Sequence, residues 1–141
     1  MIQNLSKRIL ITKVKGYSSA DTAAINSDVI DMQGFDGVVF FTTINVANAG
    51  NHIKIQQGTT TSLTDDLLGT KVIVTGTNET VGVDVYKPLE RYVRAVVTRT
   101  SSTICGEIYA LQYEGRILPA DNETAGTLNV ELHISPDEGT A

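Results

Sequence analysis

A chain of 141 residues with a formal net charge of −5 and 19% charged residues has the length of one globular domain. Its acidic balance argues against a protein whose main task is to bind nucleic acid, and its single cysteine excludes an internal disulfide. No apolar stretch approaches the length of a membrane span, and none follows the N-terminal basic pair as in a signal peptide. We therefore expect a protein made in the cytoplasm, without export and without a membrane partner.

Short apolar or alternating segments, separated by turn residues, predict an all-β chain. The segment 38–44 is the most apolar and is expected to be covered on both faces. One short helical turn is expected near Leu63 to Leu68, because Gly69 suits the end of a helix. The strand segments expected in chain order are 8–15, 23–32, 38–44, 52–56, 70–75, 81–85, 92–99, 104–113 and 128–134.

The segment 82–99 organises the predicted domain, because it holds two extended arms joined by a corner at Pro88. In its second arm Val93, Ala95 and Val97 share one face, while Arg94 lies on the other, as in a central strand. The regular spacing of strands and turns predicts a β-sandwich or a jelly-roll-like barrel. We expect this body to carry one helical turn and an extended C-terminal arm.

The predicted core consists of β-branched and aromatic side chains on the inward faces of the strands. Tyr92 and Val96 are expected to form a second layer. The core residues are Val38, Phe40, Ile53, Ile55, Val72, Val74, Val93, Val97 and Ile108.

The last part of the chain differs in composition from the rest, with prolines, glycines and scattered acids. We expect residues 1–116 to form the body and residues 117–141 to form an arm. Within the arm, the segment 128–134 alternates and presents one apolar face, which consists of Leu128, Val130, Leu132 and Ile134. A strand that buries one face needs a sheet edge, which either its own domain or a neighbouring subunit can provide.

The sequence offers no set of residues suited to catalysis or metal binding. His52 and His133 are each expected to face solvent, and no serine or cysteine lies in a nucleophile context. Asp65 and Asp66 are adjacent, so their carboxylates do not converge on a helix, and Cys105 has the character of a small buried hydrophobe. We therefore expect no enzyme activity, no metal and no cofactor.

Three arginines are the best-placed cations for binding a partner: Arg91, Arg94 and Arg99. On one face of a strand they could bind phosphate or a partner's carboxylate. The favoured alternative is that each pairs with an acid on a neighbouring strand, namely Asp84, Glu90 or Glu107. Arg91 and Arg94 join the apolar face of the arm as the candidate partner-binding residues.

Several stretches follow the pattern and order of a known protein family: Ser19 to Thr22, Val29 to Met32 with Gly34 to Phe40, Lys87-Pro88 with Arg91 to Arg94, and Ile108 to Tyr113 before Pro119. Over residues 17–119 the chain resembles the capsid decoration or cement proteins of tailed bacteriophages. The resemblance implies a jelly-roll or related β-sandwich body that assembles as dimers or trimers on the outside of the shell. It also implies that this body locks neighbouring major capsid subunits together.

We therefore expect a non-enzymatic virion protein whose partners are the major capsid protein and further copies of itself. Within the same class, the alternatives are a head–tail connector, a tail component or a head-fibre component. A carbohydrate-binding module is an alternative from another class, since β-sandwiches host many lectins. Against it stand the absence of tryptophan and an aromatic content of only 6%, because sugar platforms need exposed rings.

Overall fold

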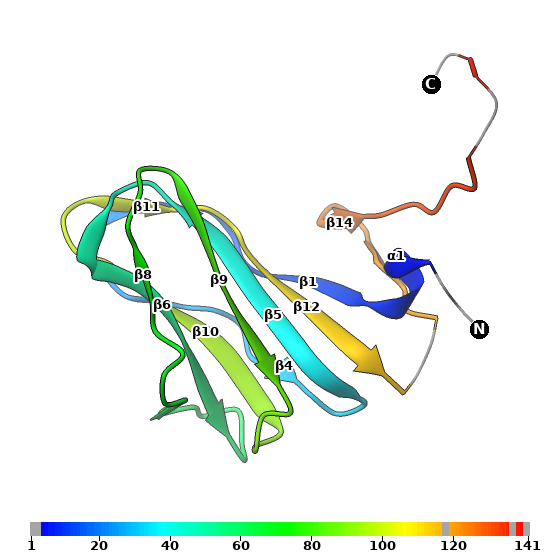
Figure 1. The fold of residues 1–141 in the computed structure, drawn as a ribbon, viewed down its shortest axis with the longest axis horizontal. Coiled ribbons are helices and arrows are strands. Elements are labelled where there is room, and N and C mark those ends of the chain that lie inside the picture. The colour runs from blue at the N-terminus through cyan, green and yellow to red at the C-terminus, as the bar shows by residue number, and fades with distance from the viewer. Residues whose placement is uncertain (1–3, 117–118, 136–137, 140–141) are drawn as a thin grey trace.

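The computed structural model describes residues 4–116, 119–135 and 138–139, and these residues are nearly all β (Figure 1). A single helical turn, α1, precedes the strands and spans Leu5–Arg8. The strands are β1 (Leu10–Lys15), β2 (Ser18–Asp21), β3 (Ile25–Asn26), β4 (Ile30–Asp31), β5 (Phe35–Ile44), β6 (Asn48–Gly58), β7 (Asp65–Asp66), β8 (Val72–Val74), β9 (Glu79–Tyr86), β10 (Tyr92–Thr98), β11 (Thr103–Cys105), β12 (Ile108–Gly115), β13 (Glu123–Thr124) and β14 (Leu128–Asn129).

Two antiparallel sheets pack face to face, and their connectivity is that of a jelly roll. In sheet A, β5 pairs with β12 and β11 on one edge and with β9 on the other, while β1 and β2 flank β12 and β11. In sheet B, β10 pairs with β6 on one edge and with β3 and β4 on the other, while β7 and β8 flank β6. The predicted β-sandwich with jelly-roll order is therefore confirmed.

The segment expected to organise the domain does lie at its centre. Strand β10 sits between β6 and the β3–β4 pair, and its inward residues Val93, Ala95 and Val97 are completely buried. The corner at Pro88 separates β9 in sheet A from β10 in sheet B, so this connection crosses from one layer to the other. Alternation of apolar side chains along β10 thus fixes which face of sheet B joins the core.

The core lies between the sheets and contains the side chains expected there. Of the predicted set, all are buried except Val72, which is partly buried at the margin of the core. Val96 is buried and Tyr92 is half-buried on the opposite face of β10. Burying these branched side chains removes apolar surface from water, which is the main favourable term for a domain whose single cysteine allows no internal disulfide.

The predicted helical turn near Leu63 to Leu68 is wrong. Residues 63–68 form no helix, because Leu63 is buried as an anchor of the loop and β7 pairs with β6. The ion pair between Lys54 Nζ and Asp66 Oδ2, at 2.7 Å, joins the side chains across that pairing. An isolated helical turn gains one or two hydrogen bonds, so strand pairing and the burial of a leucine outcompete it.

The segments 104–113 and 38–44 also differ from expectation. The former breaks at Gly106 into β11 and β12, so that both Cys105 and Ile108 point into the core despite their odd spacing. On β5 one face is buried, but the other is half-buried at Val39 and Phe41 and exposed at Thr43. Although β5 lies inside sheet A and is rich in apolar residues, only one of its two faces is fully buried.

Candidate interaction surface

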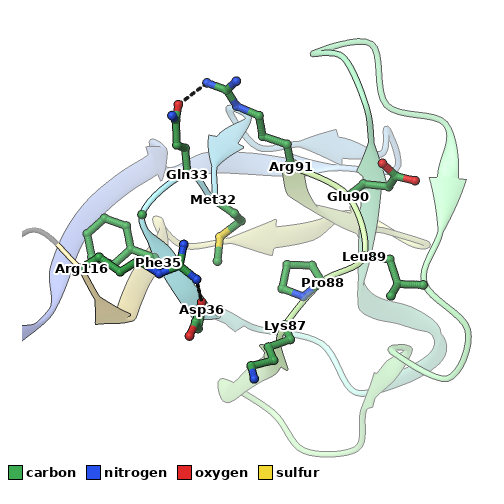
Figure 2. Close-up of a pocket in the computed structure, with 11 residues that line it drawn as sticks. Met32, Gln33, Phe35, Asp36, Lys87, Pro88, Leu89, Glu90, Arg91 and Arg116 are labelled. Carbon is green, nitrogen blue, oxygen red and sulfur yellow. Dashed lines mark hydrogen bonds and ion pairs between the residues drawn. The ribbon is translucent and has the colours of Figure 1, made fainter.

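An open cleft lies at the end of the sandwich where two turns meet (Figure 2). One turn links β4 to β5, and the other links β9 to β10. The cleft has a volume of about 540 Å³. Its walls are Met32, Gln33, Gly34, Phe35, Asp36, Lys87, Pro88, Leu89, Glu90, Arg91 and Arg116.

Main-chain hydrogen bonds hold the two turns together. The Met32 N–H donates to the Arg91 carbonyl at 2.8 Å, and the Lys87 N–H donates to the Asp36 carbonyl at 2.6 Å. Gly34 takes a φ of 88°, which its missing Cβ permits without strain. Main-chain contacts between the two turns therefore shape the cleft.

Arg91 is engaged within the chain at the rim of this cleft. Its Nε and one terminal nitrogen donate to the two oxygens of Asp31 at 2.9 and 2.8 Å, and the same nitrogen donates to Gln33 Oε1 at 2.6 Å. The Arg91 guanidinium, together with the Gln33 N–H, lowers the pKa of the Asp31 carboxyl. The expectation of an internal ion pair is confirmed, but the acid comes from β4 and is none of the three acids that the sequence nominated.

Arg94 and Arg99 also find partners inside the body, and neither partner set was expected. Arg94 donates to Gln56 Oε1 at 2.9 and 2.8 Å and to the Leu63 carbonyl at 2.9 Å. Arg99 is buried and donates to three carbonyls, those of Ser19, Ala23 and Thr103, at 2.7 to 2.9 Å. Arg94 thus ties the loop before β7 to β10, and Arg99 ties together β2, the bend that follows it and β11.

The described residues bring together no catalytic constellation. His133 is exposed as expected, whereas His52 is half-buried, and this burial lowers its pKa. Cys105 is buried, which raises the pKa of its thiol, and its Sγ lies 3.4 Å from Thr42 Oγ1. Within residues 4–116, 119–135 and 138–139 no group of three potential metal ligands is found, and no helix is long and apolar enough to cross a membrane.

The C-terminal arm is attached to the body beside β1 (Figure 1). The side chain of Asn122 is almost completely buried there. It accepts a hydrogen bond from the Ile11 N–H at 2.8 Å and donates to the carbonyls of Ser6 and Ile9 at 2.7 and 2.9 Å. The Ala120 N–H adds a bond to the Lys7 carbonyl at 2.9 Å. One buried amide therefore fixes the root of the arm.

Beyond this root the arm forms less strand than expected. Strands β13 and β14 pair as a small hairpin, so the predicted strand 128–134 is regular only at Leu128–Asn129. Figure 1 shows the following residues leading away from the sandwich. Leu128 and Val130 are half-buried, whereas Leu132 is 41% and Ile134 is 88% exposed. No described contact joins these residues to Arg91 or Arg94.

The outer face of sheet A is an apolar and aromatic surface that the sequence reasoning missed. The rings of Phe41 and Tyr109 stack at 5.8 Å, and those of Tyr86 and Tyr113 stack at 6.3 Å. Gly37 lies directly beneath the Tyr113 ring, which leaves no space for a Cβ. The alternation of Tyr109, Leu111 and Tyr113 was the available signal, but it gave no indication of the neighbours on β5 and β9.

Hydrogen bonding on this face links β12 to β9. The Tyr113 hydroxyl donates to Asp84 Oδ1 at 2.5 Å. Partial burial of the phenol, strengthened by this bond and by the charge of Asp84, raises the pKa of Tyr113 to about 12. The aromatic cluster is therefore ordered by one polar contact as well as by ring stacking.

Comparisons with known proteins give similarity at the level of structure alone. No known protein family and no curated protein sequence matches the chain. Among solved structures, a protein of the Bacillus endospore appendages, described as disulfide-linked pili, is 18% identical, with a TM-score of 0.49 over 80% of this chain and 94% of that one. The SPBc2 prophage-derived protein YomS is 14% identical, with a TM-score of 0.44 over 79% of this chain and 97% of its own. At these scores and identities, the likeness carries no conclusion about function.

Proposed function

We propose that this protein is a non-enzymatic structural component of a tailed-phage particle that binds the outer surface of the capsid as a homo-oligomer, a dimer or a trimer. In this role it stabilises contacts between major capsid subunits. The single observation that carries the proposal is the arm, an acidic segment with exposed apolar side chains that is fixed at its root and extends from a jelly-roll body. The sequence resemblance to capsid decoration proteins supplies the partner.

The proposed mechanism is burial of surface at junctions between subunits. Leu128, Val130, Leu132 and Ile134 form the apolar contact of the arm, which lies against either a second copy in the oligomer or a capsid subunit. Exposed leucine and isoleucine side chains gain free energy when a partner removes them from water. One such contact of ordinary size, burying about 800 Å² per partner, is modest in affinity, but symmetric copies on one shell act together.

Arg91 and Arg94 contribute to the proposed contact at its polar rim. The side chain of Arg91 remains 50% exposed despite its bond to Asp31, so a partner's carboxylate can share the guanidinium. The Arg94 side chain is half-buried, whereas Arg91 is exposed, and Arg94 donates a hydrogen bond to the Leu63 carbonyl in the loop that precedes β7. We expect Arg91 to affect binding directly and Arg94 to affect it through the loop.

A truncation tests the proposed function. Deleting residues 131–141 removes the exposed part of the arm but retains Asn122 and the β13–β14 hairpin. We expect the truncated protein to fold with an unchanged melting temperature and to lose binding to capsids that lack the protein, measured by co-sedimentation. Normal capsid binding by the truncated protein would contradict the role of the arm, and binding of neither form would contradict the capsid as partner.

A matched pair of variants separates apolar contact from charge. Leu132→Ser combined with Ile134→Ser removes the apolar side chains and is expected to weaken co-sedimentation. Glu131→Gln combined with His133→Asn alters the other face of the same segment and is expected to bind normally. Quantitative mass analysis of particles then distinguishes decoration, with copies in proportion to the capsid subunits, from a connector, tail or head-fibre role with a small fixed number.

The aromatic face of sheet A favours a test of carbohydrate binding as a second function. Tyr86 is 58% exposed beside the ring of Tyr113, and exposed rings are the usual platforms for sugars. A glycan array with the intact protein provides the test. Saturable binding that Tyr86→Ala abolishes would support the second function, and no bound glycan would exclude the classes of sugar on the array.

A further inference from the structure

All outer strand positions of the sandwich except one are short or interrupted. In sheet A, the pairing of β1 shifts register between Lys13 and Lys15, and the side chain of Asn122 occupies its outward edge at Ile11. Strand β2 has four residues, and its pairing with β11 is also shifted. In sheet B, the outer positions are filled by β3, β4 and β7, each of two residues, and by β8, of three. Short and irregular edges resist pairing with another chain.

Strand β9 is the exception. It pairs with β5 over all eight residues from Glu79 to Tyr86 without a register shift, and in the described part of the chain β5 is its only strand partner. Its sequence contains four β-branched residues and neither proline nor lysine, the residues that commonly protect an edge. The far edge of β9 therefore offers a long and regular row of main-chain donors and acceptors.

The core is incompletely covered beside this edge. Val85 on β9 and Val72 on β8 are only partly buried, although both pack against the core. Strand β8 lies close to β9 but pairs with β6 in the other sheet, so it does not close the edge. An added strand with one apolar face would complete the burial of both valines.

The chain also contains a segment that lacks a partner for most of its length. From Val130 to Ser135, apolar and polar side chains alternate, while regular pairing in this chain ends at Asn129. The segment starts beside β1, because the Val130 N–H donates to the Asn122 carbonyl at 3.2 Å. Strand β1 and strand β9 lie at opposite edges of sheet A, three strand spacings apart, or roughly 14 Å.

Because of this separation, residues 130–135 cannot pair along β9 of their own chain. The five residues after Val130 span at most about 17 Å when extended, so crossing the sheet would consume them. None of residues 130–135 would then remain to run along β9. A second copy has no such restriction, because its β9 edge can approach the arm from outside.

We propose that residues 130–135 of one copy add as a strand to the β9 edge of a second copy, which extends sheet A from one molecule to the next. Val130, Leu132 and Ile134 face the same side as Val83 and Val85, and Glu131 and His133 face outward with Thr80 and Asp84. The arm and the receiving edge are different surfaces of the molecule, so the contact is heterologous and builds a ring when its rotation closes. This inference rests on the homo-oligomer of the proposed function.

Disulfide trapping between copies tests the pairing. His133→Cys is mixed in equal amounts with either Thr80→Cys or Asp84→Cys, all at exposed positions of the full chain. We expect oxidation to give dimers that contain one chain of each variant, identified on a non-reducing gel and by mass spectrometry. Thr59→Cys, an exposed loop position after β6, serves as the matched control and is expected to give no dimer with His133→Cys.

A peptide of residues 127–135 provides a second measurement on the same proteins. It is expected to suppress the trapped dimer, whereas the same peptide with serine at positions 130, 132 and 134 is expected to have no effect. Absence of dimer from both mixtures, or self-dimers of Asp84→Cys that exceed the mixed dimer, would overturn the pairing. If either of these results is found and the protein still co-sediments with capsids, the edge contact is refuted and the capsid role stands.

Discussion

Replacing Asn122 with alanine should destabilise the protein through a single buried side chain. The change removes three hydrogen bonds, from the Ile11 N–H and to the carbonyls of Ser6 and Ile9, at 2.7 to 2.9 Å. Each bond contributes a net stabilisation of about 1 kcal/mol, and the main-chain groups left behind at a half-buried site regain part of this from water. We therefore expect the free energy of unfolding to fall by about 2–3 kcal/mol.

Urea denaturation followed by circular dichroism measures this loss, and thermal unfolding checks it. For a chain of this length, about 3–4 °C per kcal/mol gives a decrease of about 6–12 °C in Tm. Asn129→Ala, at an exposed position of the hairpin, is the control and should change stability by less than about 0.5 kcal/mol. If Asn122→Ala is as stable as the control, the amide does not hold the root of the arm.

A conservative variant distinguishes the donors from the acceptor. Asn122→Asp keeps an oxygen for the Ile11 N–H but turns the other oxygen toward the two carbonyls. At neutral pH a buried carboxylate there has no donor to offer, so we expect Asn122→Asp to be at least as unstable as Asn122→Ala. Its stability should recover in part at acidic pH, where the protonated acid can donate. An aspartate variant with wild-type stability at neutral pH would refute the geometry.

Four further predictions follow from the body of the protein. Phe40→Ala and Val93→Ala each empty a completely buried position and should cost about 2–5 kcal/mol in chemical denaturation; unchanged melting in both would show that the faces are misassigned. Arg99→Met leaves one buried and two part-buried carbonyls without this donor and should cost about 2–4 kcal/mol, with Arg99→Lys recovering only part, because an ammonium cannot reproduce the fork of a guanidinium; a neutral Arg99→Met would contradict this. The pKa of Tyr113 is raised from 10 to about 12, so the folded state holds the phenol proton more tightly than the unfolded state does. The stability that this group contributes is therefore fully present below pH 10 and is lost as the pH rises towards 12. Tyr113→Phe should remove this loss from the curve of stability against pH. A chelator such as EDTA should leave Tm unchanged, whereas a large decrease would reveal a metal requirement.

Much of the fold could be predicted from local pattern. Alternation along 92–98 identified the inward face of β10, because side chains on a strand point to opposite sides in turn. Turn residues between short apolar segments indicated a sandwich, and Pro88 marked the crossing between the sheets. These features depend on neighbours in sequence, which is why they could be read without a structure.

Partners that lie far apart in sequence could not be predicted in this way. Arg99 reaches carbonyls 76 and 80 residues away, and Arg91 pairs with Asp31, which is 60 residues away in sequence although it lies on the neighbouring strand β4. The expected helix at 63–68 failed for the same reason, since Leu63 gains more from the core than a helical turn gains from its own hydrogen bonds. Local propensity is worth tenths of a kcal/mol per residue, and long-range burial outweighs it.

The sequence by itself determined an all-β domain, the identity of its core residues, the amphipathic character of segment 128–134 and the lack of an evident catalytic set. Only the tertiary structure decided which edges are open and which residues Asn122 contacts. Asn122 became the anchor of the arm because the fold brings it against residues more than 110 positions earlier in the chain. The openness of β9 is likewise a property of the sheet order, which arises from contacts between distant strands and from no single segment.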